Sequence, residues 1–205
     1  MRRIAAGRAS EIFDLGDGRV LRRFLHGGDA PREAVVMEHA RARGYPVPAV
    51  HEVRDDGLVL ALIEGRTMTD DLLARPERTD EHARLLASLH RQLHELEPPP
   101  GLSQDGEGKA LLHLDLHPNN VILSPSGPVV VDWTNAARGL PALDPAMIWT
   151  ILAPLPQAAP FLAAFLAEFD AAELRAALPR AIEKRLADPS VTAAERDLVR
   201  ALVAG

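Results

Sequence analysis

The sequence predicts an α+β protein with two lobes, on three observations. Short strand candidates and a single helix occupy residues 1–64, and a second group of short strands surrounds a polar cluster at residues 113–120. From about residue 144 the apolar pattern is helical. Strands that come first and helices that come later are typical of α+β domains rather than of alternating βαβ units. Because 205 residues suit one large domain or two small lobes, we divide the chain into residues 1–64 and 65–205.

The strand candidates of the first lobe are Glu11–Leu15, Arg19–Phe24, Ala49–Val53 and Leu58–Ile63. Each pair flanks a turn that contains glycine, Gly16-Asp17-Gly18 in the first pair and Asp55-Asp56-Gly57 in the second. Between the pairs, Pro31–Arg43 is predicted to be a helix, because Asp29 is a candidate N-cap and Gly44 follows the last turn.

The second lobe begins with two predicted helices, Thr69–Leu73 and a longer one that is capped by Thr79 or Asp80 and runs to Leu96. Apolar residues recur along the longer helix at spacings of three and four, namely Ala83, Leu86, Leu89, Leu93 and Leu96. Strands are expected at Leu111–Leu114, Val121–Ser124 and Val129–Val131, with a turn at residues 125–128 between the last two. Helices make up the rest of the chain.

The composition excludes several classes of protein. The chain has no cysteine, which rules out thiol catalysis, zinc sites with thiolate ligands and a disulfide scaffold. A net charge of −6 disfavours nucleic-acid binding. No apolar run is long enough to span a membrane or to form a signal peptide, so we expect a cytoplasmic protein. The 23 basic residues include only two lysines, Lys109 and Lys184, so a mechanism that needs a lysine before residue 109 has none.

The segment from His113 to Asn120 carries five polar side chains between strongly apolar strands. Polar groups beside a core cost free energy unless they are paired, so this density requires a reason. If the strands around residues 125–128 form a hairpin, Asn120 and Asp132 lie nearly opposite each other at its open end. An amide oxygen and a carboxylate at that separation could share one hard cation, and Asp115 could reach the same region. This layout is used for phosphoryl transfer.

Two histidine patterns allow other interpretations. His113, Asp115 and His117 would point to one face of a strand and could bind a transition metal, which would indicate a metal-dependent hydrolase. That interpretation leaves Asn120 and Asp132 unexplained. His90 and His94 lie one turn apart on the long helix, where we expect packing or surface positions rather than a ligand pair.

The pattern His113-x-Asp115-x-x-x-x-Asn120, followed by Asp132, resembles the catalytic loop and metal-binding aspartate of the protein-kinase-like fold. The form Asp115-Leu116-His117-Pro118-x-Asn120 is closest to aminoglycoside phosphotransferases and other small-molecule kinases. This resemblance implies that Asp115 is the catalytic base or orients the acceptor hydroxyl, and that Asn120 and Asp132 bind Mg²⁺. It also implies structural roles near the site for His113, His117 and Asp144.

The resemblance extends to the first lobe, where it implies a small antiparallel sheet with one helix that binds the nucleotide. The segment Gly7–Phe13, which includes Ser10, resembles the turn that covers the phosphates. Glu33 resembles the helix residue that pairs with a cation of the third strand, and Arg22 stands where the family places a lysine. The residues expected to meet adenine, at the hinge that ends this lobe, are Ala61, Leu62 and Ile63.

The function implied by the resemblance is Mg²⁺-dependent transfer of a γ-phosphate from ATP or GTP to a hydroxyl of a small molecule. The helical part of the second lobe would then bind the acceptor. After Asp132 the chain has eight acidic and seven basic residues, a balance that predicts no pocket for a polycation such as an aminoglycoside. Arg22 in place of lysine, and only about 70 residues after Asp132, motivate an alternative, a weak or inactive pseudokinase-like nucleotide-binding module. The sequence specifies no oligomeric state.

Overall fold

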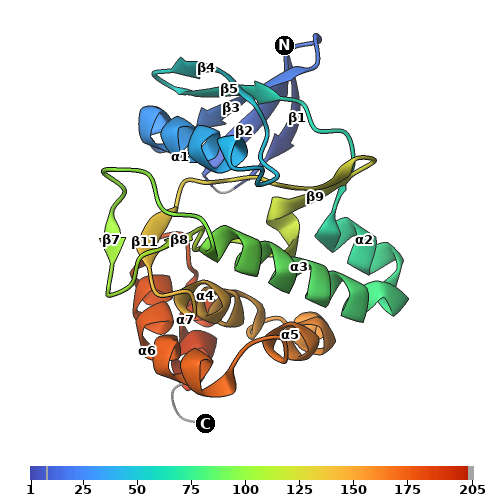
Figure 1. Ribbon diagram of the computed structural model, residues 1–205. Coiled ribbons are helices and arrows are strands. Elements are labelled where there is room, and N and C mark those ends of the chain that lie inside the picture. Colours follow the sequence, from blue (N-terminus) through green and yellow to red (C-terminus); the bar gives the residue numbers. More distant parts are fainter. Residues whose placement is uncertain (8, 203–205) are drawn as a thin grey trace.

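The computed structural model describes residues 1–7 and 9–202 and contains the two expected lobes (Figure 1). The N-terminal lobe is an antiparallel sheet of five strands in the order β1-β2-β3-β5-β4, with one helix against it. Its elements are β1 (Arg2–Ala6), β2 (Ser10–Asp14), β3 (Arg19–Phe24), α1 (Ala30–Ala42), β4 (Val50–Arg54) and β5 (Gly57–Ala61). The predicted α+β class is confirmed. Strand β1 was not among the strand candidates, because it is an exposed edge strand without apolar alternation.

The predicted helix of this lobe is α1, and its cap is the expected one. The Asp29 side chain accepts a hydrogen bond from the Arg32 N–H at 3.0 Å, which satisfies a donor of the first turn. At the other end, Gly44 has φ +83°, a left-handed conformation that glycine adopts without strain. The cap fixes the start of α1 one turn before Glu33, which is buried against the sheet.

The C-terminal lobe is mostly helical and carries two small sheets, β10-β9-β6 and β7-β11-β8. Its helices are α2 (Met68–Ala74), α3 (Thr79–His94), α4 (Leu143–Leu152), α5 (Ala159–Leu166), α6 (Ala171–Ala187) and α7 (Ala193–Ala201). Its strands are β6 (Arg66–Thr67), β7 (Gln104–Asp105), β8 (Ala110–Leu112), β9 (Val121–Ser124), β10 (Gly127–Val130) and β11 (Ala137–Gly139). Strands β6, β7 and β11 have only two or three residues each, too few to give a periodic signal.

Helix α3 buries the predicted apolar stripe, but its start differs from the prediction. Thr79 is the first residue of the helix rather than its cap, and Arg78 precedes it without a side-chain cap bond. A 3₁₀ turn, Pro76–Arg78, runs directly into the helix. The Thr79 hydroxyl therefore donates to the carbonyl oxygen of Pro76 at 2.7 Å and does not accept from a helix N–H as a cap would.

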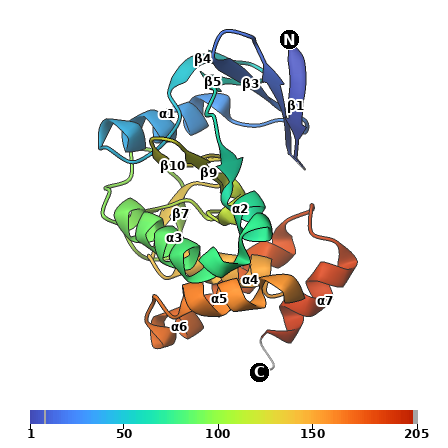
Figure 2. The same ribbon diagram turned by 90° about the vertical axis from the view of Figure 1, so that its right-hand side faces the viewer.

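The segment between β5 and β6 links the two lobes and passes close to β9, and the division of the chain at residues 64 and 65 stays a prediction. Gly65 has φ +149°, and a Cβ atom there would lie 2.4 Å from the carbonyl oxygen of Leu123 in β9. Only glycine allows this close approach of two backbones. The link is therefore held against the β9–β10 hairpin, which carries the polar cluster at its base (Figure 2).

The hairpin forms as expected, but its register is shifted by one residue from the prediction. Val130 pairs with Val121, and the N–H of Val131 donates to the carbonyl oxygen of Asn120 at 3.0 Å. The residue opposite Asn120 is therefore Val131 and not Asp132. Asp132 leaves the strand with φ +65°, which redirects its side chain relative to a continued strand.

A continuous apolar core joins the lobes. Trp133 is fully buried, and its ring lies edge-on to Tyr45 at 5.6 Å and close to His113 at 4.8 Å. The core also includes Leu58 of the N-terminal sheet and Leu86 of α3. None of the helices in the described ranges is both long enough and apolar enough to cross a bilayer.

Candidate active site

The loop at residues 113–120 is held by a buried carboxylate from α4. One oxygen of Asp144 accepts from the N–H of Leu114 at 2.6 Å, and the other accepts from the N–H of His113 at 3.0 Å. These bonds support Leu114 in a left-handed conformation, φ +64°, which is costly for a branched residue. Burial acts to raise the pKa of Asp144, but hydrogen bonds and charge from His90 and His94 outweigh it and hold the pKa well below its usual value.

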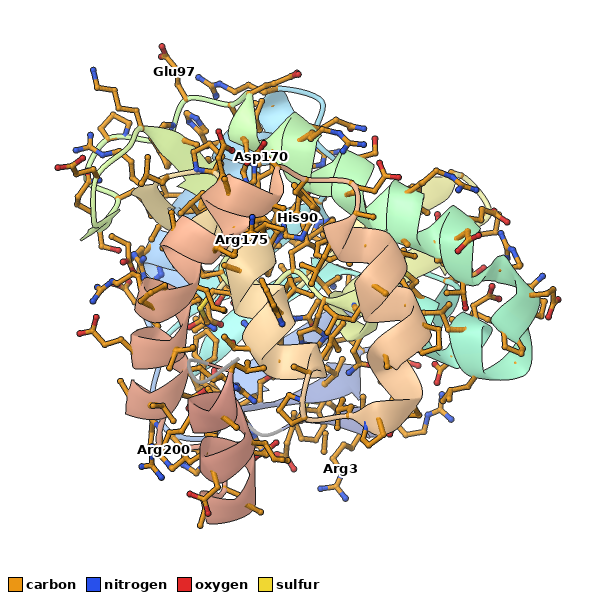
Figure 3. All side chains as sticks on the ribbon, turned by 90° about the horizontal axis from the view of Figure 1, so that it is seen from below. Arg3, His90, Glu97, Asp170, Arg175 and Arg200 are labelled. Atoms are coloured by element: carbon orange, nitrogen blue, oxygen red, sulfur yellow. The ribbon has the colours of Figure 1, made fainter. Side chains whose placement is uncertain are left out.

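His90 and His94 of α3 belong to this support. His94 Nε2 lies 3.0 Å from Asp144, and His90 Nε2 lies 3.1 Å from the carbonyl oxygen of Leu116. Figure 3 shows His90 enclosed by the helices of the C-terminal lobe. Burial, the largest influence on His90, lowers its pKa. The two histidine side chains therefore pack against the 113–120 loop inside the C-terminal lobe rather than lying on the surface.

The alternative metal site at His113, Asp115 and His117 is not formed. His113 is buried, and its Nε2 lies 3.2 Å from the carbonyl oxygen of Val131, on the core side of the loop. His117 accepts from the N–H of Asn119 through Nδ1, at 3.2 Å. Burial lowers the pKa of both histidines to about 4, so both are neutral at pH 7. Within residues 1–7 and 9–202, these three side chains do not form a ligand cluster.

Asp115 and Asn120 are brought together as the sequence predicts. The Asn120 amide nitrogen donates to the Asp115 carbonyl oxygen at 2.9 Å and to its carboxylate at 3.2 Å. Because the nitrogen faces Asp115, the amide oxygen of Asn120 is left as an acceptor. Burial and the negative charge of Asp132 raise the pKa of Asp115 to about 7. Asp115 is thus a carboxyl group whose protonation changes near neutral pH.

Asp132 is bound by the arginine that stands in place of lysine. Arg22 of β3 contacts Asp132 Oδ1 with Nη2 at 2.5 Å, and it contacts both oxygens of Glu33 with Nη1 at 2.7 and 2.8 Å. The predicted pairing of Arg22 with Glu33 is therefore present, and the same guanidinium reaches the candidate metal ligand. Arg22 and Glu33 are each only 4% exposed, so this ion pair is inside the protein.

Thr134 is part of this cluster and was missed by the sequence analysis. Its hydroxyl accepts from Arg22 Nη2 at 2.8 Å and lies 3.0 Å from Asp132 Oδ1 and 3.3 Å from Glu33 Oε2. Glu33 also accepts from the Trp133 N–H at 3.1 Å. Burial raises the pKa of Glu33 although Arg22 opposes the rise. A threonine two residues after an aspartate carries no sequence signal that could have identified it.

The other predicted nucleotide contacts lie along the N-terminal sheet. Ser10 is buried at the start of β2, where its carbonyl oxygen accepts from the Gly7 N–H at 2.8 Å; Arg8 of the same turn lies outside the described residues. At the hinge, the N–H of Ala61 donates to Ala49 and the N–H of Leu62 donates to Gly18, each at 2.9 Å. These two N–H groups are therefore already bonded within the sheet, which leaves Ile63, beyond the end of β5, as the hinge residue outside that ladder.

Comparison with protein families identifies the family of this chain. A model of the phosphotransferase enzyme family, APH, matches residues 1–110 and 102–181 of the chain. The chain belongs to this phosphotransferase family. The match covers both lobes, including Arg22, Glu33 and the segment from Asp115 to Asp132, and it confirms the resemblance predicted from the catalytic block. A search of curated protein sequences finds no match.

Solved structures show the same fold. The apo structure of a thermostable mutant of aminoglycoside phosphotransferase APH(4)-Ia matches with a TM-score of 0.71 and 17% identity, over 98% of this chain and 88% of that chain. A choline/ethanolamine kinase family protein from Mesorhizobium loti matches with a TM-score of 0.67 and 17% identity, over 99% and 85%. The microcompartment-associated aminopropanol kinase matches with a TM-score of 0.59 and 14% identity, over 97% and 87%. The kinase-like phosphotransferase fold is therefore established for this chain.

Proposed function

We propose that this phosphotransferase moves the γ-phosphate of ATP to a hydroxyl group of a small molecule, with Mg²⁺ held by Asn120 and Asp132. The observation that carries the proposal is the convergence of Asp115, Asn120 and Asp132 from one loop and one hairpin. Related folds were solved with nucleotide analogues, among them an APH(4)-Ia variant described as a ternary complex with AMP-PNP and hygromycin B.

The donor set fits Mg²⁺, which prefers oxygen ligands. The Asn120 amide presents its oxygen because its nitrogen is bonded to Asp115. Asp132 is only partly buried, so part of its carboxylate is accessible. When bound, Mg²⁺ would neutralise charge on the phosphates of the nucleotide.

We expect Asp115 to take the hydroxyl proton of the acceptor. In the proposed step, the hydroxyl oxygen forms a bond to the γ-phosphorus, the bond from that phosphorus to the bridging oxygen breaks, and ADP leaves. The hydroxyl proton passes to Asp115. Burial raises the pKa of Asp115 above its ordinary value, so its carboxylate is a stronger base than that of an exposed aspartate.

Arg22 is already paired with a proposed metal ligand, so nucleotide binding should change its partners. Its Nη2 is bound to Asp132, so Mg²⁺ would bring a second cation to a carboxylate that is already paired. We expect Arg22 to exchange Asp132 for a phosphate oxygen when MgATP binds, because a guanidinium is suited to phosphate. The same contact favours the second candidate, a nucleotide-binding module with little or no turnover, if Arg22 does not leave Asp132.

Thermal shift with ATP and Mg²⁺, followed by phosphate transfer to a panel of hydroxyl compounds, tests the proposal. Asp132→Ala should abolish Mg²⁺-dependent nucleotide binding, and Asp115→Ala should bind MgATP but transfer no phosphate. Asp55→Ala, which removes an exposed carboxylate from the β4–β5 turn, is the matched control. Binding of MgATP to Asp132→Ala as tightly as to the parent would refute the metal assignment. Binding by the parent without turnover on any acceptor would support the second candidate.

A further inference from the structure

The connection between α6 and α7 is a firmly built turn beyond the part of the chain that the family model matches. Arg196 of α7 donates to three carbonyl oxygens around the turn, those of Val191 at 3.1 Å, Asp188 at 2.8 Å and Leu186. Thr192 and Glu195 form a reciprocal capping box at the start of α7. In Figure 2 this turn rises from the helical lobe toward the β1–β2 end of the N-terminal sheet. The turn is therefore held by its own hydrogen bonds and extends from the C-terminal lobe toward the N-terminal lobe.

Arg185, in the last turn of α6, is bonded very differently from Arg196. Its side chain is only 14% exposed, and among the described residues its buried Nε has no hydrogen-bond partner. Nη1 lies 3.5 Å from Asp188 and Nη2 lies 3.9 Å from Glu195, distances that exceed those of normal hydrogen bonds. A guanidinium held this loosely and this far from water has donor capacity for a ligand.

The charge of Arg185 acts on two residues of the 113–120 loop. Burial and Asp132 raise the pKa of Asp115, and the positive charge of Arg185 opposes that rise. Burial lowers the pKa of His117, and Arg185 lowers it further. Asp188, from the same turn, also acts on Asp115. Because Coulomb coupling weakens with distance, action on two loop residues indicates that Arg185 lies within electrostatic range of the proposed catalytic carboxylate.

We propose that Arg185 anchors an oxyanion of the acceptor, a carboxylate or a phosphate group, while Asp115 meets the acceptor hydroxyl. This inference rests on the proposed function and narrows its substrate to hydroxyl compounds that also carry such an anion. The planar guanidinium presents paired N–H groups that match carboxylate and phosphate oxygens. One oxygen of Asp188 accepts from the Ser190 N–H at 2.8 Å, so a bound anion would replace the 3.5 Å contact of its other oxygen and the 3.9 Å contact of Glu195.

Matched pairs of small molecules test the inference on the full chain with MgATP. The probes are glycerate against glycerol, serine against ethanolamine, and glycerol 3-phosphate against glycerol; the last pair separates phosphate from carboxylate recognition. We expect the anionic member of at least one pair to be the better acceptor. Arg185→Gln should raise its KM at least about tenfold, the effect of losing a hydrogen bond to a charged group, and leave the neutral member unaffected. Arg185→Lys should recover part of the loss.

The control is Arg200→Gln, because Arg200 on α7 is 59% exposed, is paired with Asp197 and lies at the outer edge of the molecule (Figure 3). It should show the parent KM. The inference is overturned if neutral or cationic compounds are the better acceptors, if Arg185→Gln affects both members of a pair equally, or if its effect falls on the KM of MgATP.

Failure of the proposed function is recognised separately, as absence of MgATP binding or phosphate transfer in the parent. Calorimetric titration of the parent and Arg185→Gln with glycerate and with glycerol 3-phosphate then decides the inference without turnover. Binding that Arg185→Gln weakens at least about tenfold supports the anion site. Absence of binding to the parent, or equal binding by both proteins, overturns it.

Discussion

Replacing Arg22 by methionine should destabilise the protein in a way that depends on pH. The substitution keeps an extended apolar side chain but removes the guanidinium that, among the described residues, is the cation bonded to Glu33, which is 4% exposed. An ionised carboxylate without a partner at that depth is costly, and removing one member of a buried pair typically costs about 3–5 kcal/mol. Protonation of Glu33 on folding costs less free energy than burial of its unpaired carboxylate.

The cost of that proton sets the expected magnitude. The ordinary pKa of the glutamate side chain is 4.5, so protonating Glu33 at pH 7 costs about 3.4 kcal/mol, at roughly 1.36 kcal/mol for each pH unit. At pH 5 the same cost is below about 1 kcal/mol. In Arg22→Met the folded state holds a proton that the unfolded state releases above pH 4.5, so the unfolding free energy of the variant should rise as pH falls from 7 to 5.

Urea denaturation at several pH values measures this effect. We expect a loss of about 3 kcal/mol at pH 7 relative to the parent, and a loss of about 1 kcal/mol at pH 5. Glu33→Gln in the Arg22→Met background should remove the pH dependence. The matched control is Arg23→Met, because Arg23 is the next residue of β3, is 39% exposed and pairs with Glu11, so its loss should stay below about 1 kcal/mol. A loss in Arg22→Met that is below about 1 kcal/mol at pH 7, or that is the same at pH 5 and 7, would refute the reasoning.

Three further predictions concern carboxylates that accept hydrogen bonds within the fold. Asp144→Asn should lower the unfolding free energy by roughly 3–5 kcal/mol, because one of the two oxygens that accept from the backbone becomes an NH2 group, which cannot accept, and the charge beside His94 is lost. A urea midpoint unchanged from the parent would contradict this. Hydrogen bonds to Arg75 and His82 lower the pKa of Asp71 to about 2, below 3.8 in the unfolded chain, so its stabilising contribution is full above pH 4 and disappears as pH falls toward 2. Asp71→Asn should therefore be less stable than the parent at pH 7, and acid titration of both proteins should show the difference shrinking below pH 4. Asp29→Ala should destabilise by about 1 kcal/mol through loss of the α1 cap, and thermal unfolding that matches the parent would show that the cap is unimportant.

Local sequence signals predicted the elements whose cause is local. The helix at Pro31–Arg43 was recognisable because its cap and the glycine after its end lie within one segment of chain. The stripe of α3 was recognisable because the residues it buries recur every three or four positions. The short strands β6, β7 and β11 pair with strands that are distant in sequence, so no local pattern predicted them.

The sequence identified candidate site residues but did not predict which other side chains they contact. Asp115, Asn120 and Asp132 stand in a motif, and its resemblance to the catalytic loop of a known family identified them as candidates. Neither the register of the hairpin nor the positive φ of Asp132 has a local signal in the sequence. Thr134 and Arg185 were not identified as site residues, since each gains its role from side chains of other elements. Arg185 also lies beyond residue 181, where the match to the family model ends.

The substitution of arginine for lysine in β3 changes which parts of the molecule the site joins. An ammonium group is one point charge, whereas the guanidinium of Arg22 has two terminal nitrogens, and here they are divided between Glu33 of the N-terminal lobe and Asp132 of the C-terminal lobe. Thr134 and the Trp133 N–H add bonds from the same segment to the same cluster. One buried residue therefore couples the position of α1 to the proposed metal ligand. Release of Nη2 from Asp132 would free the carboxylate without breaking the pair with Glu33, so nucleotide binding need not disturb the packing of α1. Arginine at this position is thus compatible with phosphoryl transfer.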